Sequence, residues 1–209
     1  MQLLQLLLFV KGLAVGFAIA APVGPVGILC IQRSLTRSVL YGLASGMGAA
    51  AADAIYGAIA AFGVSFVADF LVREQYWFQL GGGALLIALG LHTVFGKWHP
   101  PGTRSQPDGR LAQDMVGTFF LTITNPITIF SFTAVFVAVG ITTGTETFLG
   151  GALLTAGVFA GSALWWTVLC NGVGLMRAAF SDDYLRVIHR ASGFVMLAFG
   201  AGALIHIFT

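Results

Sequence analysis

Six long apolar stretches, separated by polar connections, constrain the fold of this chain more than any other feature. They cover approximately residues 3–32, 38–66, 77–96, 115–139, 147–175 and 188–208. Each is long enough to cross about 30 Å of hydrocarbon as an α-helix. Only 9% of the residues are charged, whereas a soluble domain carries about a quarter, so the chain cannot cover a water-facing surface. We therefore predict an all-α integral membrane protein with six transmembrane helices in one domain, residues 1–209.

Basic residues gather on one side of the predicted helices. Eight of the ten Lys and Arg residues fall in or beside the first, third and fifth connections: Arg33, Arg37, Lys97, Arg104, Arg110, Arg177, Arg186 and Arg190. The other side holds only Arg73, and Lys11 lies within the first stretch. Its long stem favours reaching the outer surface over a pairing with Asp53. Because basic connections stay in the cytoplasm, both termini are predicted to face outward.

With three spans in each half, the two halves run through the membrane in opposite directions. That is the arrangement of an inverted repeat. We assign repeat one to about residues 1–96, a cytoplasmic loop to about 97–114, and repeat two to about 115–209.

The first and fourth spans are interrupted by proline. The first contains Pro22 and Pro25 around Gly24, and the fourth contains Asn125 followed by Pro126. Proline removes a backbone donor and clashes with the carbonyl four residues before it, so a helix cannot continue undisturbed. Inside a bilayer the freed backbone groups need partners within the protein or a wet cavity. Asn125 can line such a cavity or simply satisfy the freed carbonyls.

The two breaks lie at similar depths. Pro22 lies 11 residues before Arg33, and Pro126 lies 12 residues after Asp114. Both breaks are therefore about 17 Å from the cytoplasmic end of their spans. Matching interruptions in inverted halves indicate the binding site of a transporter, although either proline alone is also typical of a kinked, packed helix.

Asp53 is the only acid well inside a predicted span. A carboxylate at that depth is costly unless it is paired, hydrated or protonated, which favours a functional role over a structural hydrogen bond. It shares three- and four-residue spacing with small and aromatic residues: Gly42, Gly46, Ala49, Tyr56 and Ala60. Small residues let a neighbouring helix approach closely, so Asp53 is predicted to face the bundle. Tyr56, one turn on, could donate a hydrogen bond to it.

The fifth span offers an aromatic candidate. Trp165 ends a small-residue face formed by Gly150, Gly157 and Gly161, and it could stack on a substrate or serve packing alone. Trp166 is a weaker candidate.

Other chemical signatures are missing from the sequence. It has no Gly-x-x-x-x-Gly-Lys-Ser/Thr loop for phosphate and no clustered residues at metal-ligand spacing, so we expect no ATP hydrolysis and no metal site. We also expect no enzyme activity and no nucleic-acid partner. Cys30 and Cys170 lie in apolar surroundings and are predicted to be small buried residues.

The order and spacing of four motifs resemble the LysE/RhtB family of bacterial amino-acid exporters over nearly the whole chain. They are Gly24-Pro25 in span one, Asp53 in span two, Asn125-Pro126 in span four, and the run Ala160 to Trp165 in span five. The acid and the run that ends in tryptophan are similar to the lysine/arginine-exporter branch. One departure is that Val26-Gly27 follows the proline, where the family often has a polar pair such as Gln-Asn. This leaves the substrate open.

The resemblance implies a secondary transporter, not an enzyme, in the bacterial inner membrane with both termini periplasmic. It would export cationic or small neutral amino acids, or related metabolites. We expect amides beside Pro25 and Pro126 to hold the substrate carboxylate, and Asp53 to hold its ammonium or guanidinium group and to take a proton when the site is empty. The candidate substrate-binding residues are Asp53, Tyr56, Gly24, Pro25, Asn125, Pro126 and Trp165.

Several points stay open at this stage. No cofactor is expected beyond H⁺ or Na⁺ as coupling ion, and a homodimer is compatible with the pattern. One alternative is a membrane thiol-redox protein using Cys30 and Cys170, but the second cysteine falls in span five, whereas distant redox relatives of these exporters use spans one and four. Another is a metal-cation exporter of the same superfamily, which predicts spans or loops rich in His or carboxylates. A scaffold subunit leaves Asp53 unexplained.

Overall fold

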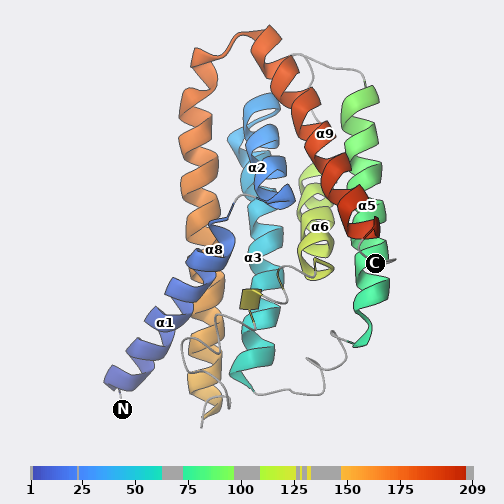
Figure 1. The fold of residues 1–209 in the computed structure, drawn as a ribbon. Coiled ribbons are helices and arrows are strands. Elements are labelled where there is room, and N and C mark those ends of the chain that lie inside the picture. The colour runs from blue at the N-terminus through green and yellow to red at the C-terminus, as the bar shows by residue number, and fades with distance from the viewer. Residues whose placement is uncertain are drawn as a thin grey trace.

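A computed structural model of the chain describes residues 2–22, 24–62, 73–96, 109–125, 128, 131–132 and 147–205. These residues form helices and no β-strand, which confirms the all-α class (Figure 1). The helices are α1 (Gln2–Ala20), α2 (Pro25–Thr36), α3 (Val39–Ala61), α5 (Gln75–Phe95), α6 (Gly109–Ile123), α8 (Phe148–Met176) and α9 (Asp182–Ile205), with a 3₁₀ turn η1 (Arg177–Ala179). Within this described part, the five helices other than α2 and α6 are long and apolar enough to cross a membrane.

The first predicted span consists of two helices in the structure. Helix α1 ends at Ala20, just before Pro22, because a residue that precedes proline is disfavoured in the α conformation. The chain is extended at Gly24, and α2 starts with Pro25 in its first turn, where proline costs no hydrogen bond. Helix α6, which begins the fourth predicted span, ends at Ile123. Pro126 lies outside the described residues.

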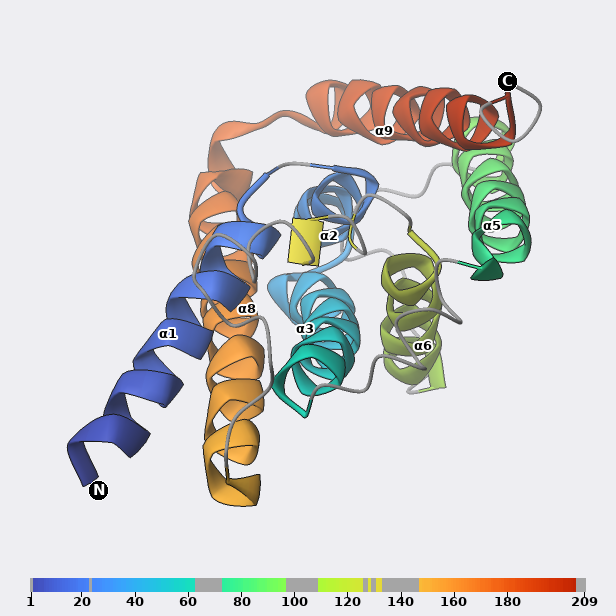
Figure 2. The same ribbon diagram turned by 60° about the horizontal axis from the view of Figure 1, so that its bottom comes forward.

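Helix α2 occupies the centre of the bundle. It packs against α3, α6, α8 and α9, and Figure 2 shows it between these helices. Ten of its twelve residues are buried, including the polar Gln32, Arg33 and Ser34. A short helix with a buried polar end needs specific partners there, and these are described below.

The long helices pack in pairs. Helix α1 lies along α8, α5 lies along α9, and α3 lies between α6 and α8. The α1–α8 pair is held by direct backbone contact: a Cβ added at Gly157 would overlap the carbonyl oxygen of Phe9, and one at Gly161 would overlap that of Leu13. The small-residue face predicted for this stretch is thus a close-packing surface, because only glycine lets two helix backbones approach so closely.

The starts of two helices differ from the prediction. Helix α9 begins at Asp182 rather than near residue 188, and α6 begins at Gly109 rather than near residue 115. The first turns of both helices are polar, so an apolar pattern does not detect them. Asp182 and Asp183 lie in the first turn of α9, where negative charge complements the helix dipole. Arg186 and Arg190 are consequently part of a helix rather than of a connection.

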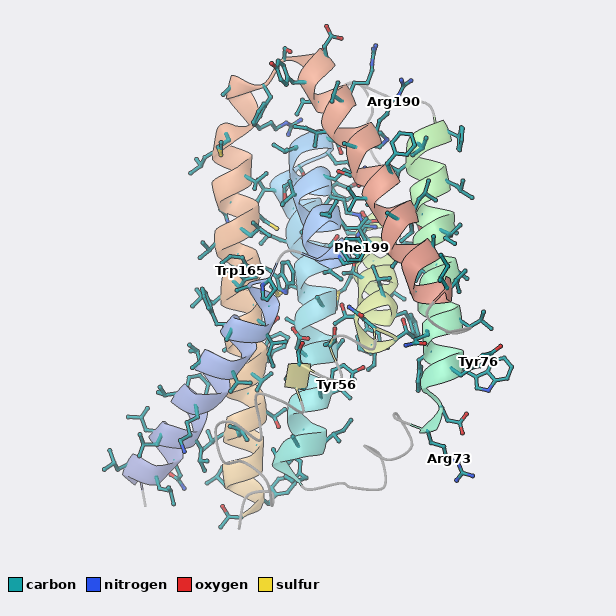
Figure 3. All side chains as sticks on the ribbon, in the orientation of Figure 1. Tyr56, Arg73, Tyr76, Trp165, Arg190 and Phe199 are labelled. Carbon is teal, nitrogen blue, oxygen red and sulfur yellow. The ribbon has the colours of Figure 1, made fainter. Side chains whose placement is uncertain are left out.

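Charged side chains differ between the two ends of the molecule. Arg33 and Arg37 close α2, and Arg190 lies in the first turns of α9, all at the end opposite the N-terminus (Figures 1 and 3). Arg73, just before α5, lies at the other end. Within the described ranges, Arg33, Arg37 and Arg190 therefore lie at one end and Arg73 at the other, as the sequence pattern predicts.

We predict that Gly161→Leu destabilises the fold by about 1–3 kcal/mol, because the new side chain would push α1 away from α8. Gly172→Leu is the matched control, since a Cβ at Gly172 on the same helix meets no atom within 4 Å. The melting temperatures of the two variants in detergent would show the difference. Equal melting temperatures would contradict close α1–α8 packing.

Candidate functional site

Asp53 is buried in the middle of α3, where its side chain faces the bundle. The residue is 3% exposed, and the Gly42, Gly46, Ala49 and Tyr56 positions of its stripe are buried as well. Ser162 Oγ on α8 donates a hydrogen bond of 2.7 Å to Asp53 Oδ2. Trp166 Nε1, one turn further along α8, donates to Ser162 Oγ at 3.1 Å. This chain of donors orients one carboxylate oxygen. The other, Oδ1, has no hydrogen-bond partner among the described residues.

A cavity of about 260 Å³ lies against this carboxylate. Its walls come from six helices and from the segments that follow α1 and α6. The described lining residues are Ile19, Ala20, Pro22, Gly24, Pro25, Val26, Gly27, Ala49, Asp53, Thr122, Asn125, Thr128, Ser131, Trp166 and Phe199. The structure thus brings four sequence-predicted site residues to one cavity, namely Asp53, Gly24, Pro25 and Asn125. The fifth predicted position in this region, Pro126, lies outside the described residues.

The start of α2 presents free backbone donors to this cavity. The first intrahelical bond of α2 is donated by Ile28 to the Gly24 carbonyl oxygen, at 3.0 Å. The N–H groups of Val26 and Gly27 precede that bond and have no acceptor within the helix. Gly24, in the N-cap position, supplies no side-chain cap. This end of α2 is therefore electropositive, and Val26 and Gly27 line the same cavity as Asp53.

Tyr56 is near Asp53 but has a different partner. Its hydroxyl donates to the carbonyl oxygen of Ile123 at 2.5 Å, and its ring packs on Phe132. Ile123 is the last residue of α6, whose final carbonyls have no intrahelical donor. Tyr56 thus caps α6 instead of bonding the Asp53 carboxylate, and it does not line the cavity.

The two tryptophans of α8 lie on different faces. Trp165 packs edge-on against Phe17 of α1, with ring centroids 5.3 Å apart, and lies beside the end of α1 in Figure 3. Trp166 is 4% exposed and lines the Asp53 cavity. The sequence pattern favoured Trp165 over Trp166 and did not indicate Ser162. The four-residue spacing of Ser162 and Trp166 could have indicated that the two residues share one face of the helix.

A polar cluster joins three helices near the arginine-bearing end of α2. Arg33 Nη2 forms an ion pair of 3.0 Å with Asp114 Oδ1, and Arg37 Nη1 lies 2.8 Å from Asp114 Oδ2. Arg33 Nη1 also donates to Ser45 Oγ at 2.6 Å and to Thr118 Oγ1 at 3.0 Å. The guanidinium of Arg33 thus joins α2 to α3 and α6. We call these five residues the Asp114 latch.

The two cysteines lie in the layer between the cavity and the latch. Cys30 and Cys170 are free and 0% exposed. They belong to a buried cluster that also contains Leu29 and Met196. Burial agrees with their prediction as small core residues, and it keeps both thiols away from any partner protein.

Comparison with known proteins adds an independent observation. The model of a family described as LysE type translocator matches residues 17–206 of the chain. A protein of Bacillus subtilis (strain 168), named "Putative amino acid efflux protein YcgF", is 24% identical over 198 residues, covering 92% of this chain and 93% of that protein. No solved structure matches the chain.

We predict that Ser162→Ala destabilises the protein by about 1–3 kcal/mol, because it leaves the Asp53 carboxylate and the Trp166 N–H without a partner. Ser192→Ala is the control, since Ser192 also loses a hydrogen bond, to Ile188 O, but far from Asp53. A double-mutant cycle with Asp53→Asn, measured by unfolding in detergent, should give non-additive effects for Ser162 and additive effects for Ser192. Additivity at both positions would contradict the Ser162–Asp53 contact.

Proposed function

Because the chain belongs to the LysE type translocator family, we propose that it is a secondary exporter of amino acids whose substrate binds in the cavity beside Asp53. Members of this family are transporters, not enzymes. The similar Bacillus subtilis protein is named for amino acid efflux. An amino acid is a zwitterion, so the cavity must recognise a positive and a negative group together.

The observation that carries the proposal is the opposed polarity of the cavity walls. The Asp53 carboxylate lies on one wall and the free amides at the start of α2 lie on another. An amino acid carries an ammonium and a carboxylate on neighbouring atoms. Asp53 Oδ1 would accept from the ammonium, while the N–H groups of Val26 and Gly27 would donate to the carboxylate. The carboxy-terminal end of α6, near Asn125, adds negative polarity for the ammonium.

The pattern of helix contacts supports an inverted repeat. In this arrangement α1 with α2, α3 and α5 form the first half, and α6, α8 and α9 belong to the second. Helix α1 is then equivalent to α6, α3 to α8, and α5 to α9. The contact of α1 with α8 therefore corresponds to the contact of α6 with α3. Two further extensive contacts, α3 with α8 and α5 with α9, join equivalent helices. In transporters with such repeats the substrate site lies at the interface of the halves near the membrane midplane. The Asp53 cavity is lined by residues of both proposed halves, which supports this location.

Asp53 would also couple transport to protons. A carboxylate buried among helices needs a counter-charge, water or a proton. Ser162 satisfies only one of its oxygens. In our proposal the carboxylate binds the substrate ammonium in one state and a proton in the returning state, which gives antiport. The same geometry would hold Na⁺ only with additional oxygen ligands.

The Asp114 latch would be the gate on the basic side. It joins α2 and α3 of the first half to α6 of the second, on the side of the cavity that carries most arginines. By the positive-inside rule this is the cytoplasmic side of the inner membrane, with both termini periplasmic. The structure would then correspond to a state closed to the cytoplasm, and cytoplasmic substrate would enter when the latch opens.

Two rival functions find less support. A thiol-redox protein must expose a cysteine to its partner, whereas Cys30 and Cys170 are fully buried. For a metal-cation exporter, no group of three or more His, Cys, Asp or Glu that could hold a metal occurs within the described ranges.

We predict that Asp53→Asn abolishes proton-coupled export, because asparagine keeps the shape of the side chain but cannot exchange a proton for an ammonium group. Asp183→Asn, the same change at an exposed position in α9, is the control. Export of isotope-labelled amino acids from cells preloaded with peptides measures the effect. If Asp53→Asn exported as well as wild type, the proposed role of the carboxylate would be wrong.

We also predict that Asp114→Asn opens the cavity to the cytoplasm more often, since Arg33 and Arg37 lose their common counter-charge. The readout is labelling of Thr122→Cys by a membrane-impermeant maleimide in inside-out vesicles, in a background of Cys30→Ala and Cys170→Ala. Labelling should be at least about tenfold faster than with aspartate at 114. Arg37→Gln, which removes only the outer ion pair, should give an intermediate rate. Equal rates in all three proteins would contradict a gate at the latch.

A further inference from the structure

A second and larger cavity, of about 470 Å³, adjoins the Asp53 cavity. The two share Pro25, Val26, Asn125 and Phe199 as lining residues, so a single ligand could extend through both. We call the larger cavity the side chamber. Its size lies within the range of about 300–1,000 Å³ that is typical of small-molecule sites. It is bounded by α2, α5, α9 and the end of α6, and Figure 3 shows the labelled Phe199 on α9 facing this central region.

The walls of the side chamber are mostly apolar. The described residues that line it, besides the four shared ones, are Gln79, Gly82, Gly83, Leu86, Leu121, Thr124, Ala198, Gly202 and Ala203. None of these carries a charge. Burying an ionised group among such walls is unfavourable unless a counter-charge is present, so the chamber is unsuited to a lysine or arginine side chain.

One side chain in the chamber lacks a partner. Gln79 on α5 is 6% exposed, lines the chamber, and has no hydrogen-bond partner among the described residues. By contrast, the hydroxyl of Thr124 donates to Phe120 O at 2.6 Å and is thus occupied. Among the described residues the buried side-chain N and O atoms without a partner include no atom of Gln79, so the Gln79 amide opens onto the chamber, where a ligand or a water molecule can bond to it. Gln79 was not among the candidates from the sequence, although it is a lone polar residue in an apolar run.

We infer that the side chamber binds the side chain of the substrate, and that the preferred substrates are amino acids with large, uncharged side chains that offer one hydrogen-bonding atom to Gln79. This inference rests on the proposed function, because Asp53 and the start of α2 would hold the ammonium and carboxylate of the substrate in the adjoining Asp53 cavity. It differs from the cationic or small neutral substrates expected from the sequence. The difference arises because the acid serves the common ammonium group and leaves no acid for the side chain.

Gly202 offers a way to fill the chamber without disturbing the fold. A Cβ added there meets no atom within 4 Å, although the residue lines the chamber. Gly202→Leu should therefore narrow the chamber while the helices stay in place. Gly81→Leu is a matched control, because Gly81 on α5 is exposed, also has no atom within 4 Å of its added Cβ, and is not among the lining residues.

The test is export of tyrosine, phenylalanine, alanine and lysine from cells that carry the wild type or one of three variants. Wild type should export tyrosine and phenylalanine faster than alanine and lysine. Gly202→Leu should export tyrosine at least about tenfold more slowly than wild type but export alanine at the wild-type rate, because only large side chains need the chamber. Gly81→Leu should match wild type. Gln79→Leu should lower the ratio of tyrosine to phenylalanine export about tenfold, since it removes the bonding partner of the hydroxyl.

The outcomes separate this inference from the proposed function. If wild type exported alanine or lysine but neither aromatic amino acid, the side-chamber inference would be overturned and the exporter function would stand. An unchanged size preference in Gly202→Leu would have the same meaning. The side-chamber inference would also be overturned if native mass spectrometry found a lipid bound to wild type but not to Gly202→Leu, because the chamber would then be a lipid site. If wild type exported no amino acid at all, both proposals would fail.

Discussion

The buried carboxylate of Asp53 is the constraint on which the account of this protein depends. A charge in the middle of an apolar helix is costly, and the fold offers it only partial relief, through Ser162 and, behind it, Trp166. Asp53 also lines a cavity that is shared with the first residues of α2, whose amides have no acceptor within the helix. The carboxylate attracts a small cationic group, and the amides attract a small anionic group. A zwitterion satisfies both at once, which is why the geometry favours an amino acid over a simple cation.

The position of α2 links this site to the rest of the molecule. The helix is short because prolines prevent α1 from continuing, so its start lies inside the bundle and its basic end lies at the latch. The same twelve residues therefore supply donors to the cavity and hold Arg33 against Asp114. Between these two ends the buried layer that includes Leu29 and Cys30 seals the bundle. A movement of α2 that opened the latch would also change the cavity, so substrate binding and gating would be coupled through one rigid element.

Much of this arrangement could be predicted from local chemistry. Proline explains where α1 ends and α2 begins, and the three- and four-residue spacing around Asp53 correctly indicates its face. Other features depend on how helices rotate and approach in three dimensions. Trp165 and Trp166 are neighbours in sequence and lie about 100° apart around a helix, so only the packing of α8 decides which one lines the cavity. Arg33 and Asp114 served as markers of span ends, and their pairing across 81 residues appears only in the folded chain. Gln79 is a lone polar residue in an apolar run, and only the cavity beside it in the folded chain indicates a role for it.

The most direct test of the central claim is to count the protons released when substrate binds. Purified protein in detergent, weakly buffered near neutral pH, would be mixed with an amino acid that it exports, and the pH change followed with an indicator dye. If the Asp53 carboxyl group exchanges its proton for the substrate ammonium, binding should release up to about one proton per protein, and Asp53→Asn should release none. Substrate binding by wild type with no proton release at any pH from about 5 to 9 would contradict the account.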